Sequence, residues 1–89
     1  MRQGDWNQLR LMDSHATQRA RRHLESLVRA DLRESPYAEM GRVTCILKER
    51  VLTLTGRVSS YYLKQIAQRI ALARLNGAVT VVNQLQVEP

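Results

Sequence analysis

The sequence predicts an α+β domain with the order α-β-β-α-β, in which two helices pack on one face of a small three-stranded mixed sheet. Residues 43–48, 51–58 and 78–88 place apolar and polar side chains alternately, which is typical of half-buried strands. Residues 14–34 and 60–76 instead repeat apolar residues at helical spacing. A chain of 89 residues suffices for one such domain, so we expect an N-terminal extension over residues 1–13 and one domain over residues 14–89.

The first helix is expected to run from Ser14 to about Glu34. Ser14 is a favourable N-cap, and Pro36 ends the helix because the residue before a proline is pushed out of the helical conformation. Asp31 projects near the apolar side of this helix, which the sequence does not explain beyond its closeness to the helix end. The residues expected to face the core are Ala20, Leu24, Leu27, Val28 and Leu32.

The first two strands are expected to form a hairpin around Glu49 and Arg50. Two-residue hairpins favour Asn-Gly or Asp-Gly because their turns need positive φ angles, so this turn is expected to be wider or strained. Gly56, inside the second strand, marks a bulge or a close approach of another group. The side chains expected to point inward are Val43, Cys45, Leu47, Leu52, Leu54 and Val58.

The second helix is expected to be capped by Ser59 or Ser60 and to end at Asn76-Gly77, where the glycine supplies a left-handed cap. Its apolar stripe is expected to centre on Leu63, Ala67 and Ile70, flanked by Ile66 and Ala71.

The last strand places Asn83 on its inner side, together with Val81, Leu85 and Val87. A buried amide needs hydrogen-bond partners, so Asn83 is expected to tie the strand to a neighbouring loop. The strand-helix-strand connection should cross over right-handed, which leaves the other face of the sheet open.

The charge of the chain is unevenly distributed. The formal net charge is +6, and residues 41–89 carry seven Lys and Arg against two Glu. Such a bias favours anionic partners, although it is also a common way for a protein to stay soluble.

Nothing in the sequence predicts an enzyme. His15 and His23 lie on one predicted helix, about 80° apart, with no nucleophile or carboxylate pattern to join them. Cys45 is the only cysteine, so neither an internal disulfide nor a cysteine-based metal site is expected, and at an inward strand position it acts as a small hydrophobe. No metal, cofactor or small-molecule substrate is therefore expected.

The chain as written carries no apolar run typical of a secretory signal and no segment long enough for a transmembrane helix. This favours a cytoplasmic location, while a removed export signal and association with the cell envelope stay open. The role of Trp6 and its neighbours in residues 1–13 is likewise left open.

Three stretches resemble the BON domain, named for bacterial osmotic-shock and nodulation proteins. They are LTLTGRV at residues 52–58, AQRIA at residues 67–71 and NGAVTVVNQLQV at residues 76–87. Arg50 and Ala78 depart from the family pattern, which commonly has glycine and valine there. The matching positions are Leu54, Thr55, Gly56, Val58, Ala67, Gly77, Val82 and Asn83.

The resemblance covers about residues 43–88 and implies a non-catalytic module that binds phospholipid membranes or other proteins, often within a larger envelope or osmotic-stress protein. In this setting Gly56, Gly77 and Asn83 are expected to have structural roles.

Lipid binding is the leading functional hypothesis. Its carriers would be an arginine stripe on the first helix, within an arc of roughly 80° opposite the apolar side. Guanidinium groups suit phosphate because they donate two hydrogen bonds at once. A solvated helix face is the alternative for the same stripe, whose residues are Arg19, Arg22, Arg29 and Arg33.

The second hypothesis is protein interaction or self-association through the open sheet face, with Ile46, Val51 and Val82 as an apolar patch among polar residues. Nucleic-acid binding fits the charge. However, the sheet lacks the interleaved aromatic residues needed for base stacking, and no GxxG loop is present, so nucleic acid is not the expected partner.

Overall fold

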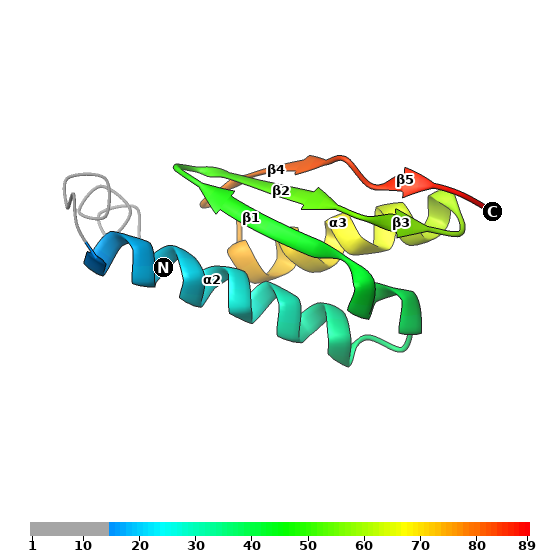
Figure 1. Cartoon of the computed structure of the whole chain (residues 1–89), viewed down its shortest axis with the longest axis horizontal. Coiled ribbons are helices and arrows are strands. Elements are labelled where there is room, and N and C mark those ends of the chain that lie inside the picture. The colour runs from blue at the N-terminus through cyan, green and yellow to red at the C-terminus, as the bar shows by residue number, and fades with distance from the viewer. Residues whose placement is uncertain (1–14) are drawn as a thin grey trace.

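The computed structural model describes residues 15–89, with side chains described from residue 18 onward (Figure 1). The expected Ser14 cap and the expected extension over residues 1–13, including Trp6, lie outside the described residues. The described elements are α2 (His15–Glu34), the 3-10 helix η1 (Ala38–Arg42), β1 (Thr44–Lys48), β2 (Val51–Thr55), β3 (Arg57–Val58), α3 (Tyr61–Leu75), β4 (Thr80–Asn83) and β5 (Gln86–Val87).

These elements confirm the predicted α+β fold. The central strand β2 pairs antiparallel with β1 and parallel with β4, giving the strand order β1-β2-β4. Burial alternates strictly along β1, where Cys45 and Leu47 are buried and Thr44, Ile46 and Lys48 are exposed. The helices therefore cover one face of the sheet and leave the other open, as Figure 1 shows.

Two predicted strands are each interrupted rather than continuous. The segment 51–58 divides at Gly56 into β2 and β3, and the segment 78–88 divides into β4 and β5, so that β3 pairs parallel with β5. A Cβ atom at Gly56 would lie 3.3 Å from the carbonyl oxygen of Arg42 and 3.6 Å from the Leu85 side chain. Gly56 has a φ of 130°, so the expected close approach is confirmed, and the chain bends here between β2 and β3.

The hairpin turn is tight. Lys48 pairs directly with Val51, so the two-residue turn is not widened, and Glu49 adopts a φ of 58°. The strain expected for a non-glycine residue is therefore present at Glu49.

The cap of α3 is Ser60, whose Oγ accepts a hydrogen bond from the Leu63 amide at 3.2 Å. Ser59 does not cap α3. Its amide donates a hydrogen bond to a carboxylate oxygen of Glu39 at 2.8 Å, which connects η1 to the start of α3. At the other end of α3 the left-handed cap residue is Asn76, with a φ of 50°, rather than Gly77 alone.

The apolar stripe of α3 is displaced from the prediction. The buried residues recur every fourth position, whereas Ile66 and Ile70 are only partly buried because they face α2 across a gap between the helices. Met40 of η1 is fully buried, which the sequence did not indicate. The core consists of Val28, Leu32, Met40, Val43, Cys45, Leu47, Leu52, Leu54, Val58, Leu63, Ala67, Ala71, Leu75, Val79 and Leu85.

Candidate functional site

The position of α2 is fixed by a carboxylate that reaches the edge of the sheet. An oxygen of Glu25 accepts a hydrogen bond from the Leu47 amide at 2.6 Å, and the Cys45 thiol lies 3.6 Å from the Glu25 carbonyl oxygen. Burial raises the pKa of the Cys45 thiol, which fits a packing role rather than a reactive one. Glu25 thus holds α2 along β1, and the side of α2 opposite its buried residues Val28 and Leu32 faces outward.

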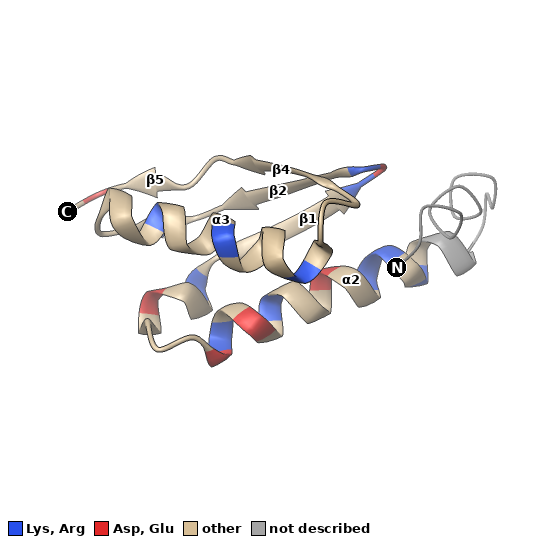
Figure 2. Ribbon diagram, turned by 180° about the vertical axis from the view of Figure 1, so that it is seen from behind, with Lys and Arg blue, Asp and Glu red and all other residues tan. Residues whose placement is uncertain are grey.

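That outward side carries the arginine stripe predicted from the sequence. Arg19, Arg22 and Arg33 are exposed, and none of them forms an ion pair with another described residue. Arg29 differs, because its side chain is 43% exposed and its Nη2 lies 3.8 Å from a carboxylate oxygen of Glu25. Figure 2 shows basic residues spread along α2, with acidic residues between them toward its C-terminal end. Among the described residues, three of the four predicted arginines are therefore exposed without an ion pair, and Arg29 is partly engaged.

Asp31, which broke the helical pattern, has a partner on α3. Its two carboxylate oxygens accept hydrogen bonds from Nε and Nη2 of Arg74 at 2.7 Å and 2.8 Å. The hydrogen bond from Arg74 holds the pKa of Asp31 below its ordinary value of 3.8, with partial burial acting against it. This bidentate pair joins the two helices near the C-terminal end of each.

We expect Asp31→Asn to lower the melting temperature slightly at neutral pH, by at most a few degrees, because a half-exposed pair contributes little. A carboxyl group whose pKa is lowered on folding stabilises above its unfolded pKa and loses that contribution as the pH falls through the folded value. The difference between wild type and Asp31→Asn should therefore be present at pH 7 and shrink as the pH falls below the ordinary pKa of an aspartate, about 3.8. Thermal unfolding followed by circular dichroism tests this. A difference that persists unchanged at low pH would show that the ion pair is not its source.

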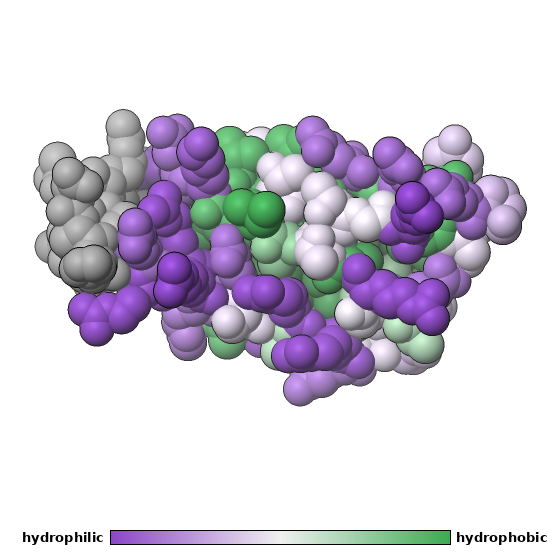
Figure 3. All heavy atoms as spheres, viewed as in Figure 1, coloured by the Kyte–Doolittle hydropathy of each residue, from purple (hydrophilic) through white to green (hydrophobic). Residues whose placement is uncertain are grey.

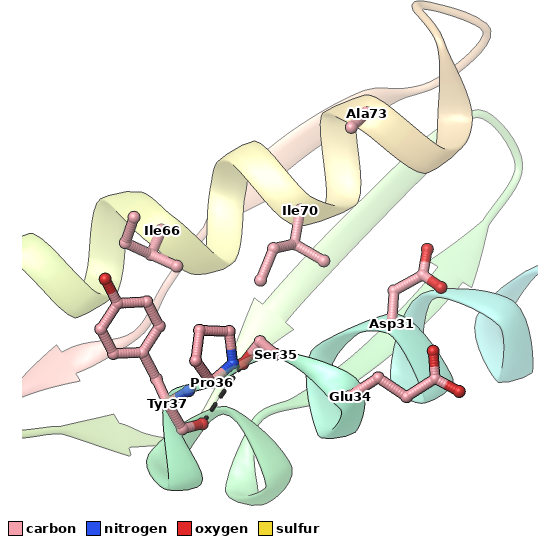
Figure 4. A pocket seen from close by; sticks show the side chains of 8 residues that line it. All are labelled: Asp31, Glu34, Ser35, Pro36, Tyr37, Ile66, Ile70 and Ala73. Atoms are coloured by element: carbon pink, nitrogen blue, oxygen red, sulfur yellow. Dashed lines mark hydrogen bonds between the residues drawn. The ribbon is translucent and has the colours of Figure 1, made fainter.

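An open groove lies between the end of α2 and α3 (Figure 4), with a volume of about 410 Å³. The turn at its base is held by Ser35, whose Oγ accepts a hydrogen bond from the Tyr37 amide at 3.3 Å. No local sequence pattern indicates this groove, because its two walls are far apart along the chain. It is lined by Asp31, Glu34, Ser35, Pro36, Tyr37, Ile66, Ile70 and Ala73.

Beside the groove, two tyrosines contact each other. The hydroxyl groups of Tyr37 and Tyr62 are 2.9 Å apart, and the rings meet edge to face with centroids 5.9 Å apart. The hydrogen bond to Tyr62 raises the pKa of Tyr37. Tyr62 therefore packs on the turn after α2, whereas Tyr61 is 73% exposed.

The structure places the three predicted interface residues on the open sheet face. The Cα atoms of Ile46 and Val82 flank that of Thr53 in one row across the sheet, while Val51 lies at the hairpin end. Ile46 is 60% exposed, and Val51 and Val82 are exposed to lesser extents. Figure 3 shows hydrophobic residues over the strands, surrounded by hydrophilic ones.

Asn83 ties β4 to a helix rather than to a loop. Its Nδ2 donates to the carbonyl oxygen of Lys64 at 2.8 Å and lies 3.2 Å from the side-chain oxygen of Gln68, both on α3. Its Oδ1 accepts a hydrogen bond from the Leu85 amide at 3.2 Å. The side-chain amide of Asn83 therefore finds its hydrogen-bond partners on α3 and on the segment between β4 and β5.

Within the described part of the chain, no three His, Cys, Asp or Glu side chains lie together in a way that could hold a metal ion. None of the described helices is both long enough and apolar enough to cross a membrane.

Comparison with known families gives a match to the BON domain over residues 20–89. The match begins within α2, so it extends the resemblance seen over residues 43–88 into the first helix. No curated protein matches the chain significantly. BON domains are generally non-catalytic and are associated with the binding of phospholipids or proteins. The chain belongs to the BON domain family.

Proposed function

We propose that this domain binds anionic phospholipid surfaces through the outward side of α2. The observation that supports the proposal best is the exposure of Arg19, Arg22 and Arg33 on the side of the helix turned away from the sheet, without an ion pair among the described residues. These arginines span about 21 Å along the helix, at 1.5 Å per residue, so they can contact several headgroups at once.

The chemistry of the arginine side chain suits a phosphate partner. A guanidinium group is always charged and donates hydrogen bonds in a planar fork that matches two phosphate oxygens. Each basic residue close to an anionic membrane contributes about 1 kcal/mol. Three or four of them together give weak binding that salt screens, and no residue need enter the hydrocarbon layer.

The choice of residues for a test follows from the contacts of α2. Replacing Arg29 with Glu would place a second carboxylate beside Glu25, whose hydrogen bond to the Leu47 amide holds α2 on the sheet. A loss of vesicle binding in that variant could therefore come either from weaker affinity or from a less stable fold. Arg22 and Arg33 form no ion pair with a described residue, so they are the better pair to change.

We expect the double variant Arg22→Gln/Arg33→Gln to bind anionic vesicles roughly 30-fold more weakly than wild type, corresponding to about 2 kcal/mol. Co-sedimentation with phosphatidylglycerol-containing vesicles, at low and at physiological salt, measures this, and phosphatidylcholine vesicles give the neutral baseline. The melting temperature should stay within a degree or two, because both side chains are exposed.

The matched control is Lys48→Gln/Arg69→Gln, which removes the same charge from exposed positions outside α2. It should keep most of the affinity. Equal weakening in both double variants would mean that net charge, rather than the α2 surface, attracts the vesicles. Wild type that fails to sediment with anionic vesicles even at low salt would overturn the proposal.

A further inference from the structure

The two edge strands of the sheet, β1 and β4, differ in what covers their outer sides. Along β1, the edge is covered by α2, and Glu25 accepts the hydrogen bond of the outward-facing Leu47 amide. Along β4, no further strand pairs with its outer side among the described residues. No described element lies beyond β4 and β5 in Figure 1, or in Figure 2 from behind.

The main-chain N–H and C=O groups that β4 turns toward the open edge follow from those that it turns toward β2. The amides of Thr80 and Gln84 donate to the carbonyl oxygens of Arg50 and Leu54, so even-numbered residues of β4 face β2. In a parallel pair, residues whose N–H and C=O face the partner strand alternate with residues whose N–H and C=O both point away from it. The outward groups of β4 are therefore those of Val81 and Asn83.

The open edge also lacks charge. From residue 75 to residue 87 there is no charged side chain, although a quarter of the chain is charged and its net charge is +6. Natural edge strands are commonly protected by Lys, Pro or an inward-pointing charge. β4 has none of these, and its shortness is what limits its pairing.

We propose that β4 pairs antiparallel with β4 of a second copy of this chain, around a two-fold axis through Val82. A two-fold axis at this residue sets Val81 of each copy opposite Asn83 of the other. Each of these two pairs exchanges two N–H···O=C hydrogen bonds, which gives four in all. Two copies with a charge of +6 repel each other, and pairing through this uncharged edge adds no close contact between like charges to that repulsion.

The side chains of the open face fit the same arrangement. Val82, which is 37% exposed, would face Val82 of the other copy in a close cross-strand pair of β-branched residues. Thr80 would lie opposite Gln84, both exposed and uncharged. The two sheets then form one six-stranded sheet with all helices on one side. This inference does not depend on phospholipid binding, because the stripe on α2 lies away from the edge.

The register gives a direct test by cysteine cross-linking. The Cα atoms of a non-hydrogen-bonded antiparallel pair are about 4.5 Å apart, within the range that a disulfide spans. Val82→Cys should therefore form a covalent dimer under mild oxidation. Thr80→Cys is the matched control, because its counterpart in the other copy lies four positions away, roughly 14 Å. Cys45 is buried and should remain unlinked.

Sedimentation velocity at high protein concentration separates the edge from the open face. Wild type and Ile46→Lys should both dimerise, and Val82→Lys should be monomeric with an unchanged circular dichroism spectrum. Loss of the dimer in Ile46→Lys as well would assign association to the face and overturn the edge pairing. A monomeric wild type, together with no faster cross-linking in Val82→Cys than in Thr80→Cys, would also overturn it. Vesicle binding by monomeric Val82→Lys keeps this outcome separate from the proposed function.

Discussion

Gly56→Ala is expected to lower the free energy of unfolding by about 2–4 kcal/mol. A non-glycine residue in a sparsely populated backbone region costs about 1–3 kcal/mol, and the φ of Gly56 is 130°. The added Cβ would also lie 3.3 Å from the carbonyl oxygen of Arg42, a main-chain atom that moves only with η1. Overpacking of this kind adds roughly another 1 kcal/mol or more.

The matched control for this prediction is Gly77→Ala. Gly77 has a φ of 79°, but a Cβ atom added there would have no neighbour within 4 Å, so only the backbone cost of about 1 kcal/mol is expected. Urea unfolding of both variants measures the difference. Equal destabilisation would show that the contact with η1 contributes nothing and that Gly56 serves only the backbone angle.

Leu52→Ala is expected to destabilise the domain by about 3 kcal/mol. Leu52 is fully buried in the central strand, and removing its methyl groups loses both their transfer free energy and the packing around the cavity left behind. A domain of 89 residues has a total stability of roughly 4–13 kcal/mol, so this loss is a large fraction of it. The melting temperature should fall by roughly 12–24 °C.

Ile46→Ala provides the comparison, because it removes a similar number of apolar atoms from a residue that is 60% exposed. Its effect should stay within about 0.5 kcal/mol. Thermal unfolding of the two variants checks the assignment of inner and outer faces. Similar losses in both would mean that Ile46 is covered in solution, which would point to association through the open face.

The faces of the strands could be predicted from the sequence because alternation is a local property. Leu47 and Ile46 are neighbours in β1, and their opposite burial follows from the period of two alone. The same holds for Val28 and Leu32 on α2, four residues apart. The predicted stripe of α3 was displaced because helical spacing defines an apolar arc, and the position of α2 decides which part of that arc is buried.

The candidate site was predictable only in part. Helical geometry brought the four arginines to one side of α2, but their individual contacts depend on partners elsewhere in the chain. Arg29 is engaged because Glu25 is drawn to the edge of β1, 22 residues away in the sequence. No local pattern reports such a contact, and the burial of Met40 in η1 gave no periodic signal either.

By itself, the sequence determined the order of elements, the inner and outer faces of the strands and the family of this protein, because each depends on short-range spacing. Only the tertiary structure decided that Asp31 pairs with Arg74, 43 residues away, that Asn83 reaches α3, and that one sheet edge is covered while the other is open. These features arise when separate elements pack together, since ion pairs and edge hydrogen bonds form between groups that the chain itself does not hold near each other.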